Sequence, residues 1–261
     1  MSDKLIWVMD AGNTNIKSGL FLGEKLLHTW RLTTDGDRTA DEYGILMMQM
    51  FQIHRISLDQ IEGIIISSVV PSVNFNLDRM CRKHFGHTPL FVGPGIKTGL
   101  NIRIDNPKEL GADITANAVA AWHHCHSAAV VIDFGTATTF FALSGKCELL
   151  GGAIFPGVKV ASEALITHTS QLPRFELQRP ESSIGRNTIH SLQAGMIYGY
   201  KGVVESIAGQ LKRELGEPNA PVFATGGMST LMSNQTDIIT DVHSYLTLEG
   251  LRLIYEKNRP E

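Results

Sequence analysis

The sequence is poor in cysteine, in long apolar runs and in positive charge, and each shortage excludes a class of protein. Its three cysteines lie far apart and form no CxxC pair, which supports neither a disulfide framework nor a cysteine-rich zinc site. No apolar run approaches the roughly 18 residues of a membrane span. The apolar stretch 5–9 is also too short for the core of a signal peptide. We therefore expect a soluble, cytoplasmic protein.

The charge balance argues against binding to nucleic acids or membrane surfaces. The 261 residues carry 23 Lys and Arg against 26 Asp and Glu, a net charge of −3, whereas proteins that bind phosphate backbones or anionic lipids usually carry the opposite sign. Hydrophobic residues make up 43%, enough for a substantial core. The length suits one large domain or two of about 130 residues each. We expect no nucleic-acid partner and no membrane partner.

The chain contains an internal repeat. Residues 8–21 and 131–144 both run from an apolar strand through Asp-x-Gly and a polar turn into a second apolar strand. Both segments predict β-hairpins with a glycine-containing tip. Their aspartates, Asp10 and Asp133, are separated by close to half the chain. Two similar halves, each beginning with the same hairpin, explain this spacing most simply.

Strands and helices are predicted to alternate along the chain, which indicates α/β layers with helices packed on sheets. We predict two related lobes, residues 1–114 and 115–261, and expect the closing helix to be able to pack back on the first lobe. Helices are predicted over 39–54, 72–85, 106–123 with a break at Gly111, 187–215 and 246–258, and further strands over 61–67, 90–92 and 222–225.

The first hairpin carries residues suited to the phosphates of a nucleotide. The carboxylate of Asp10, at a strand end, suits a hydrated Mg²⁺ ion. Gly12 lets the backbone approach a phosphate closely, Asn13 and Thr14 add side-chain donors, and Lys17 adds a positive charge. A plain β-turn uses the same residue types for backbone reasons alone, so this hairpin by itself does not decide between the two.

The second hairpin shifts the balance toward a nucleotide site. Asp133, Gly135, Thr136 and Thr138 repeat the chemistry of the first hairpin, and the glycine pair Gly226-Gly227 follows another predicted strand. Two hairpins suited to phosphate, together with a glycine-rich strand end, predict a nucleotide cleft between two related lobes.

These motifs resemble the phosphate-1, phosphate-2 and adenosine motifs of the superfamily that contains actin, the sugar kinases and Hsp70. Within it, the chain resembles the type III pantothenate kinases over almost its whole length, which is far more specific than any one glycine motif. The matching segments are residues 10–14, 39–44, 67–71, 92–100, 111–113, 133–139, 151–157, 184–188, 224–227 and 246–251.

The resemblance implies a fold of two actin-like (ribonuclease H-like) lobes with an ATP cleft between them. It also implies ATP-dependent phosphorylation of pantothenate to 4'-phosphopantothenate, the first step of coenzyme A biosynthesis, by a homodimer that needs Mg²⁺ and a monovalent cation (K⁺ or NH₄⁺). Asp113 matches the catalytic base, Asp10 the Mg²⁺ ligand and Asp133 the ligand of the monovalent cation. The resemblance assigns ATP to Asp10, Ala11, Gly12, Asn13, Thr14, Asn15, Ile16, Lys17, Thr136, Gly226 and Gly227, and pantothenate to Ile104, Gly111, Ala112, Asp113, Ile114 and Thr188.

Two positions depart from the family pattern. Ile114 stands where the family usually has arginine, and Ile104 where it usually has tyrosine. Isoleucine supplies neither the donors nor the charge of arginine. Two alternatives therefore stay open, a kinase with a different, less polar acceptor and a non-catalytic regulatory homologue. Arg103 and Arg186 are the nearby basic residues that could compensate.

Two further clusters have simpler explanations. Residues 123–126 read His-His-Cys-His; this is more typical of a helix end, where histidine suits the helix dipole, than of a metal site, because no second ligand pair follows at the usual spacing. Met47, Met48 and Met50 fit one helix face and are expected to serve core or dimer packing.

Overall fold

The computed structural model describes residues 4–259, which form two compact units. Unit 1 contains residues 4–99, 106–120 and 247–259, and unit 2 contains residues 100–105 and 121–246. The units are thus not the uninterrupted stretches 1–114 and 115–261 of the sequence prediction. Residues 100–105 belong to unit 2 because a short strand there pairs with a strand of that unit, and residues 247–259 join unit 1.

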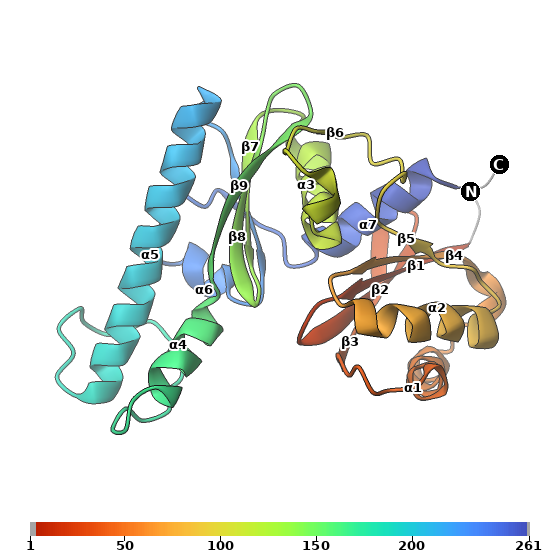
Figure 1. The fold of residues 1–261 in the computed structure, drawn as a ribbon, viewed down its shortest axis with the longest axis horizontal. Coiled ribbons are helices and arrows are strands. Elements are labelled where there is room, and N and C mark those ends of the chain that lie inside the picture. Colours follow the sequence, from red (N-terminus) through yellow and green to blue (C-terminus); the bar gives the residue numbers. More distant parts are fainter. Residues whose placement is uncertain (1–3, 260–261) are drawn as a thin grey trace. The chain divides into compact units, whose positions relative to one another are not determined.

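The secondary structure alternates as an α/β protein should (Figure 1). The strands are β1 (Leu5–Ala11), β2 (Asn15–Leu22), β3 (Lys25–Thr33), β4 (Ile61–Ser68), β5 (Leu90–Phe91), β6 (Asn101–Ile102), β7 (Ala129–Phe134), β8 (Ala137–Leu143), β9 (Glu148–Pro156), β10 (Val222–Gly226) and β11 (Asp241–Val242). The helices are α1 (Ala40–Ile53), α2 (Pro71–Phe85), α3 (Ala112–Cys125), α4 (Val158–Thr167), α5 (Thr188–Leu215), α6 (Ser229–Ser233) and α7 (Leu246–Lys257), with 3₁₀ turns η1 (Leu58–Gln60) and η2 (Pro107–Glu109).

Unit 1 is built on a sheet of strand order β3-β2-β1-β4-β5. The first three strands are antiparallel neighbours, whereas β1, β4 and β5 run parallel. Every residue of β1 is buried, as expected for a central strand covered on both faces. On one face, Trp7 and Met9 pack with Tyr43 and Met47 of α1 and Leu77 of α2. Met48 and Met50 pack against the same cluster, so the predicted methionine face belongs to the core.

Helix α7 packs within unit 1 on the sheet face that α1 and α2 leave uncovered (Figure 1). A Cβ added to Gly63 of β4 would overlap the Tyr255 hydroxyl, and one added to Gly19 of β2 would lie 3.0 Å from Leu248. The guanidinium of Arg252 lies 5.8 Å from the ring centroid of Phe21. Two strand glycines thus provide the room in which this helix packs.

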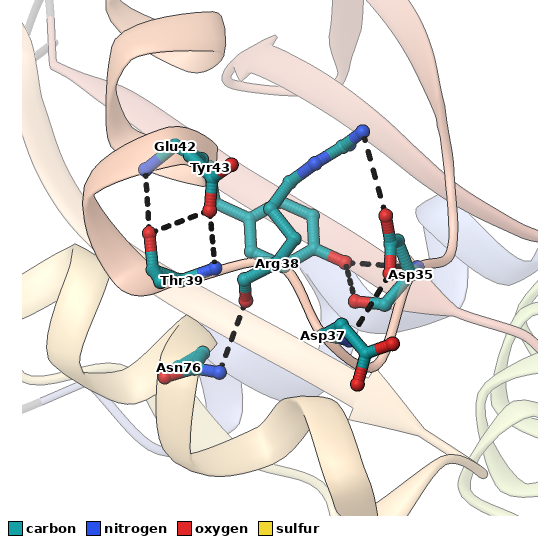
Figure 2. Close-up of polar contacts among 7 residues, drawn as sticks. All are labelled: Asp35, Asp37, Arg38, Thr39, Glu42, Tyr43 and Asn76. Carbon is teal, nitrogen blue, oxygen red and sulfur yellow. Dashed lines mark hydrogen bonds and ion pairs between the residues drawn. The ribbon is translucent and has the colours of Figure 1, made fainter.

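The loop between β3 and α1 is fixed by a dense set of polar contacts (Figure 2). Thr39 and Glu42 form a capping box at the start of α1, which satisfies backbone donors at the helix end. The Tyr43 hydroxyl accepts a bond from the Asp35 backbone N–H at 3.1 Å and donates to the Asp35 carbonyl at 2.9 Å. Asn76 of α2 donates to the Arg38 carbonyl at 3.0 Å. The loop is therefore held at both ends.

Unit 2 repeats the strand order of unit 1. Its sheet runs β11-β10-β7-β8-β9-β6, so that β7, β8, β9, β10 and β11 take the places of β1, β2, β3, β4 and β5. The antiparallel and parallel pairs also match. Helices α4, α5 and α6 cover one face, where Val158, Met196 and Met232 pack with Ile132 and Phe140 (Figure 1). The internal repeat seen in the sequence thus corresponds to the same strand order and strand directions in both units.

The observed elements agree with most of the predicted ones. Both hairpins, the strands near 61–67, 90–92 and 222–225, and the helices near 39–54, 72–85, 187–215 and 246–258 are present within a few residues. The break predicted at Gly111 separates η2 from α3. Strands β3, β6, β9 and β11 and helices α4 and α6 were not predicted. Within residues 4–259, every helix is too short or too polar to span a bilayer.

Candidate active site

In unit 1, a row of three polar side chains crosses the end of the sheet. In the strand register, Asp10 of β1 is level with Lys17 of β2 and with Ser67 of β4. Ser67 Oγ donates to Asp10 Oδ1 at 2.7 Å, and Lys17 Nζ lies 3.9 Å from Asp10 Oδ2. Asp10 is 7% exposed, and the Lys17 side chain is one-third exposed. The row therefore holds a buried carboxylate between a hydroxyl and a reachable ammonium group.

The turn that follows Asp10 presents backbone and side-chain donors. Gly12 N–H donates to the Asn15 carbonyl at 3.1 Å, which closes the turn, while the side chains of Asn13 and Thr14 are exposed at its tip. Thr34, just after β3, stabilises this turn with two hydrogen bonds. Its hydroxyl donates to the Gly12 carbonyl at 2.6 Å and its backbone N–H to the Thr14 carbonyl at 3.1 Å.

Asp113 lies in the first turn of α3, half-buried. Burial raises the pKa of its carboxyl group, while hydrogen bonds from backbone N–H groups and the charge of Lys17 act in the opposite direction. The Ile114 N–H donates to Asp113 Oδ1 at 2.8 Å. A Cβ on Gly111 would overlap that oxygen, so the glycine leaves the room that the carboxylate occupies. Because its pKa is raised, Asp113 is a better proton acceptor than an exposed aspartate.

In unit 2, Asp133 of β7 occupies the place that Asp10 has in unit 1. It is level with Thr139 of β8 and Thr225 of β10 in the strand register. Asp133 Oδ1 lies against the end of β10, where Gly226 has a φ of +90° and an added Cβ would fall 2.5 Å from this oxygen. Only glycine fits there, for both conformational and steric reasons.

The β7–β8 turn is also packed against a glycine. A Cβ on Gly157, at the start of α4, would overlap the Thr136 carbonyl, and the Gly157 N–H donates to that carbonyl at 3.1 Å. Gly227 N–H donates to the Phe134 carbonyl at 3.1 Å. Thr136 and Gly227 are themselves exposed. The structure therefore brings Asp133, Thr136 and the Gly226-Gly227 pair together at one end of the unit 2 sheet.

A cavity of about 570 Å³ opens in unit 2 beside this end of the sheet. Met228, the residue after the glycine pair, lines it. Lys159, Ser162 and Glu163 of α4 contribute a polar wall, and Phe175 and Leu177 contribute apolar side chains. Its volume and mixed lining suit a small organic ligand. No sequence pattern indicated this cavity, because α4 and the segment after it were not predicted.

The remaining predicted substrate residues are divided between the units. Gly111, Ala112, Asp113 and Ile114 belong to unit 1, whereas Ile104 and Thr188 belong to unit 2. Ile104 is half-buried beside Gly151 of β9, and Thr188 is exposed at the start of α5, after the cap residue Asn187.

Neither arginine near these positions is buried among them. Arg103 pairs with Glu148 of β9 at 3.1 Å, and Arg186 is exposed.

Two carboxylates suit metal ions of different kinds. Asp10 offers an oxygen at a strand end beside the phosphate-type turn, as a hydrated Mg²⁺ ion requires. Asp133 offers an oxygen beside the backbone of Gly226, which suits a larger cation bound by several oxygens. The residues present therefore fit both ions.

Solved structures with the same fold are numerous and functionally mixed. A candidate transcriptional activator of the Baf family from Campylobacter jejuni matches with a TM-score of 0.61 and 18% identity over 97% of this chain and 98% of the other. A candidate 2-dehydro-3-deoxygalactonokinase from Sinorhizobium meliloti matches with a TM-score of 0.59 and 12% identity over 98% and 97%. The inorganic polyphosphate/ATP-glucomannokinase of Arthrobacter sp. strain KM matches with a TM-score of 0.51 and 12% identity over 98% of both chains. At such identities the likeness concerns the fold alone.

The repeated sheets and paired hairpins of the two units form the fold that these solved structures share. The family model of type III pantothenate kinase matches residues 6–210, well over half of the chain. The chain belongs to the type III pantothenate kinase family and is a phosphotransferase. Membership implies ATP and a divalent metal ion as its cofactors.

Proposed function

We propose that this protein transfers the γ-phosphoryl group of ATP to the primary hydroxyl of pantothenate and so forms 4'-phosphopantothenate, the first step of coenzyme A biosynthesis. The observation that carries the proposal is the environment of Asp113 in unit 1. Its carboxylate is half-buried, has a raised pKa and is close enough to Lys17 to be influenced by that charge. A proton acceptor thus lies near a cation and the buried Asp10.

In the proposed reaction, Asp113 orients the acceptor hydroxyl and takes its proton. The hydroxyl oxygen forms a bond to the γ-phosphorus while the bond from that phosphorus to the bridging oxygen of ADP breaks. Such transfer needs alignment and charge neutralisation more than strong activation of the nucleophile. A raised pKa brings Asp113 nearer to the operating pH, where a general base is most effective.

The ATP phosphates are assigned to the β1–β2 turn, residues 10–17, and to Thr136 of the second hairpin. Lys17 supplies positive charge, and the exposed tip supplies donors from Asn13 and Thr14. Asp10 is the residue that would hold Mg²⁺, which when bound neutralises charge on the phosphate oxygens. The adenosine is assigned to Gly226, Gly227 and the adjoining cavity beside Met228, whose apolar and polar walls suit a base and a ribose.

Following the family resemblance, we assign pantothenate to Gly111–Ile114, Ile104 and Thr188. The half-buried Ile104 offers no polar contact, so the remaining polar groups of pantothenate need other donors. The exposed Thr188 hydroxyl at the start of α5, where backbone N–H groups are also available, can supply one.

The same family resemblance supports a monovalent cation at Asp133, a homodimer and a cytoplasmic location. Packing of the Asp133 carboxylate against the Gly226 backbone favours the cation site. Leu150 and Ile154 of β9 are 42% and 72% exposed, which favours a self-association surface. The three cysteines are free thiols, as a reducing compartment favours.

The test is a coupled assay of ADP release with ATP, Mg²⁺, K⁺ and pantothenate. The expected result is turnover that depends on pantothenate and falls about 10²- to 10⁴-fold in kcat in Asp113→Asn. ATP binding, measured separately by calorimetry, should survive this substitution because Asp113 faces the acceptor. ADP release that does not depend on pantothenate, with ATP binding intact, would overturn the acceptor assignment and favour a different acceptor or a regulatory role.

A further inference from the structure

Two histidines from distant parts of the chain lie ring to ring in unit 2, outside the site described above. His124 is in the last turn of α3, and His243 follows β11. Their ring centroids are 4.3 Å apart and the rings are inclined by 36°. In the sequence, the histidines at the end of α3 have no second ligand pair at the usual spacing. The fold supplies a partner from about 120 residues further along the chain.

The second of these histidines has a ring nitrogen that makes no hydrogen bond. Asp241 Oδ2 lies 3.0 Å from His243 Nε2, and the His243 side chain is 20% exposed. The contact lacks hydrogen-bond geometry, so this buried nitrogen has no hydrogen-bond partner among the described residues. A buried polar atom left in this way commonly marks the place of a water molecule or an ion.

We propose that His124 and His243 bind a divalent transition-metal ion such as Zn²⁺. One nitrogen of each ring lies within 4.8 Å of the other, and metal–nitrogen bonds of about 2.0–2.1 Å bridge nitrogens up to about 4.2 Å apart. The exposed His124 ring closes the difference by a small rotation. Imidazole ligands select Zn²⁺, Ni²⁺ or Cu²⁺ over Mg²⁺ and Ca²⁺, which prefer oxygen.

The surroundings of the pair suit a bound ion. Phe223 of β10 stands beside both rings, 6.2 Å from His124 and 5.6 Å from His243 by ring centroids. An apolar wall on one side lowers the local dielectric constant and strengthens the metal–ligand interaction, while the exposure of His124 leaves an entry path. The ion would join the end of α3 to the loop after β11, two segments next to the points where the chain passes between units 1 and 2.

The test is calorimetric titration of the full chain with ZnCl₂, after treatment with a chelator and without nucleotide. The expected result is one equivalent of Zn²⁺ bound, with at least a tenfold weaker Kd in His124→Ala and in His243→Ala. One equivalent of Zn²⁺ should raise the Tm of the native protein and leave that of His124→Ala unchanged.

The matched control is His123→Ala, which removes an exposed histidine from the same helix turn, whose ring centroid lies 6.1 Å from that of His124. It should bind Zn²⁺ as the native protein does. His28→Ala tests the other close histidine pair, His28 and His54 in unit 1, whose ring centroids are 4.2 Å apart. The proposal is overturned if the native protein binds no Zn²⁺, if His124→Ala keeps the native Kd, or if His28→Ala loses the binding instead. Because His124 is exposed, His124→Ala is expected to fold. It therefore tests the proposal even if His243→Ala fails to fold.

Discussion

Ser67 donates a hydrogen bond of 2.7 Å to Asp10 across the parallel pair β1/β4, and both residues are buried. The bond lies between side chains at the same level of adjacent strands, so it needs no flexible loop to form. It holds one carboxylate oxygen in place while the other faces Lys17 at 3.9 Å. Ser67 is therefore a positioning residue for the proposed Mg²⁺ ligand.

Replacing Ser67 by alanine should weaken both stability and metal use. The variant leaves a buried carboxylate oxygen without its hydroxyl donor, which costs about 1–3 kcal/mol. We expect a lower free energy of unfolding in urea and a higher Mg²⁺ concentration for half-maximal activity. Ser68→Ala is the control, because Ser68 bonds with the backbone of Val70 instead. It should leave the Mg²⁺ dependence unchanged, and an unchanged dependence in Ser67→Ala would contradict the positioning role.

Replacing Lys17 by methionine should move the pH dependence of activity. The charge of Lys17 lowers the pKa of Asp113, so its removal raises that pKa further. Because a general base must be ionised, the acid limb of the profile of kcat/KM against pH should move to higher pH. Lys17→Arg keeps the charge and should keep the limb in place. A limb that stays in place or moves to lower pH in Lys17→Met would contradict the coupling.

Asp113→Asn should make the protein more stable at neutral pH while it removes activity. Burial raises the pKa of Asp113 above its ordinary value, so the folded state holds this proton more tightly than the unfolded state does. The native protein therefore bears a cost of ionised Asp113 above the raised pKa, and the cost fades as the pH falls through it. Melting temperatures of both proteins across this range should converge at acidic pH. A constant difference would point to packing instead.

Replacing Thr34 by valine should weaken the binding of ATP and change the stability of the fold less. Thr34→Val keeps the shape but removes the donor to the Gly12 carbonyl. The loss of one hydrogen bond, about 1 kcal/mol, should raise the KM for ATP about fivefold and leave the KM for pantothenate unchanged. Thr34→Ser keeps a hydroxyl and should restore the native KM. Equal changes in both KM values would show that the turn is not specific to ATP.

The two glycines of the pair 226–227 should respond differently to alanine. An added Cβ at Gly226, where φ is +90°, meets Asp133 Oδ1 and the Phe134 backbone, whereas one at Gly227 meets nothing within 4 Å. We expect Gly226→Ala to lose at least about 1–3 kcal/mol of stability from backbone strain. It should also weaken ATP binding, as calorimetry can measure. Gly227→Ala should fold normally. Similar stability of the two variants would contradict the steric account.

The sequence predicted the repeated hairpins and the long helices because their signals are local. Asp-x-Gly between apolar strands and caps such as Thr39 lie within a few residues of the element that they define. Strands β3 and β9 were missed for a physical reason, because nearly all of their positions are half-buried or exposed, which weakens the apolar pattern.

The residues that contact the candidate site residues are brought to them from distant parts of the sequence. Ser67 and Thr34 contact Asp10 and Gly12 through sheet pairing and a loop, and their sequence neighbourhood has no feature of phosphate chemistry. Two signals were available for Ser67. It begins the family-matching segment 67–71, and it ends the predicted strand 61–67, where adjacent parallel strands bring their carboxyl ends together. His243 had no such signal, since its partner lies on another element.

The place of α7 in unit 1 has a consequence for synthesis on the ribosome. The ribosome has synthesised residues 121–246 of unit 2 before it has synthesised α7. Unit 1, in contrast, lacks the helix that packs beside Gly19 and Gly63 until α7 has been synthesised. Until then, one face of the first sheet is left open to water and to other chains. Vectorial folding usually completes the N-terminal part first. In this protein unit 2 can complete its fold before unit 1. The N-terminal hairpin must therefore stay soluble until α7 has been synthesised.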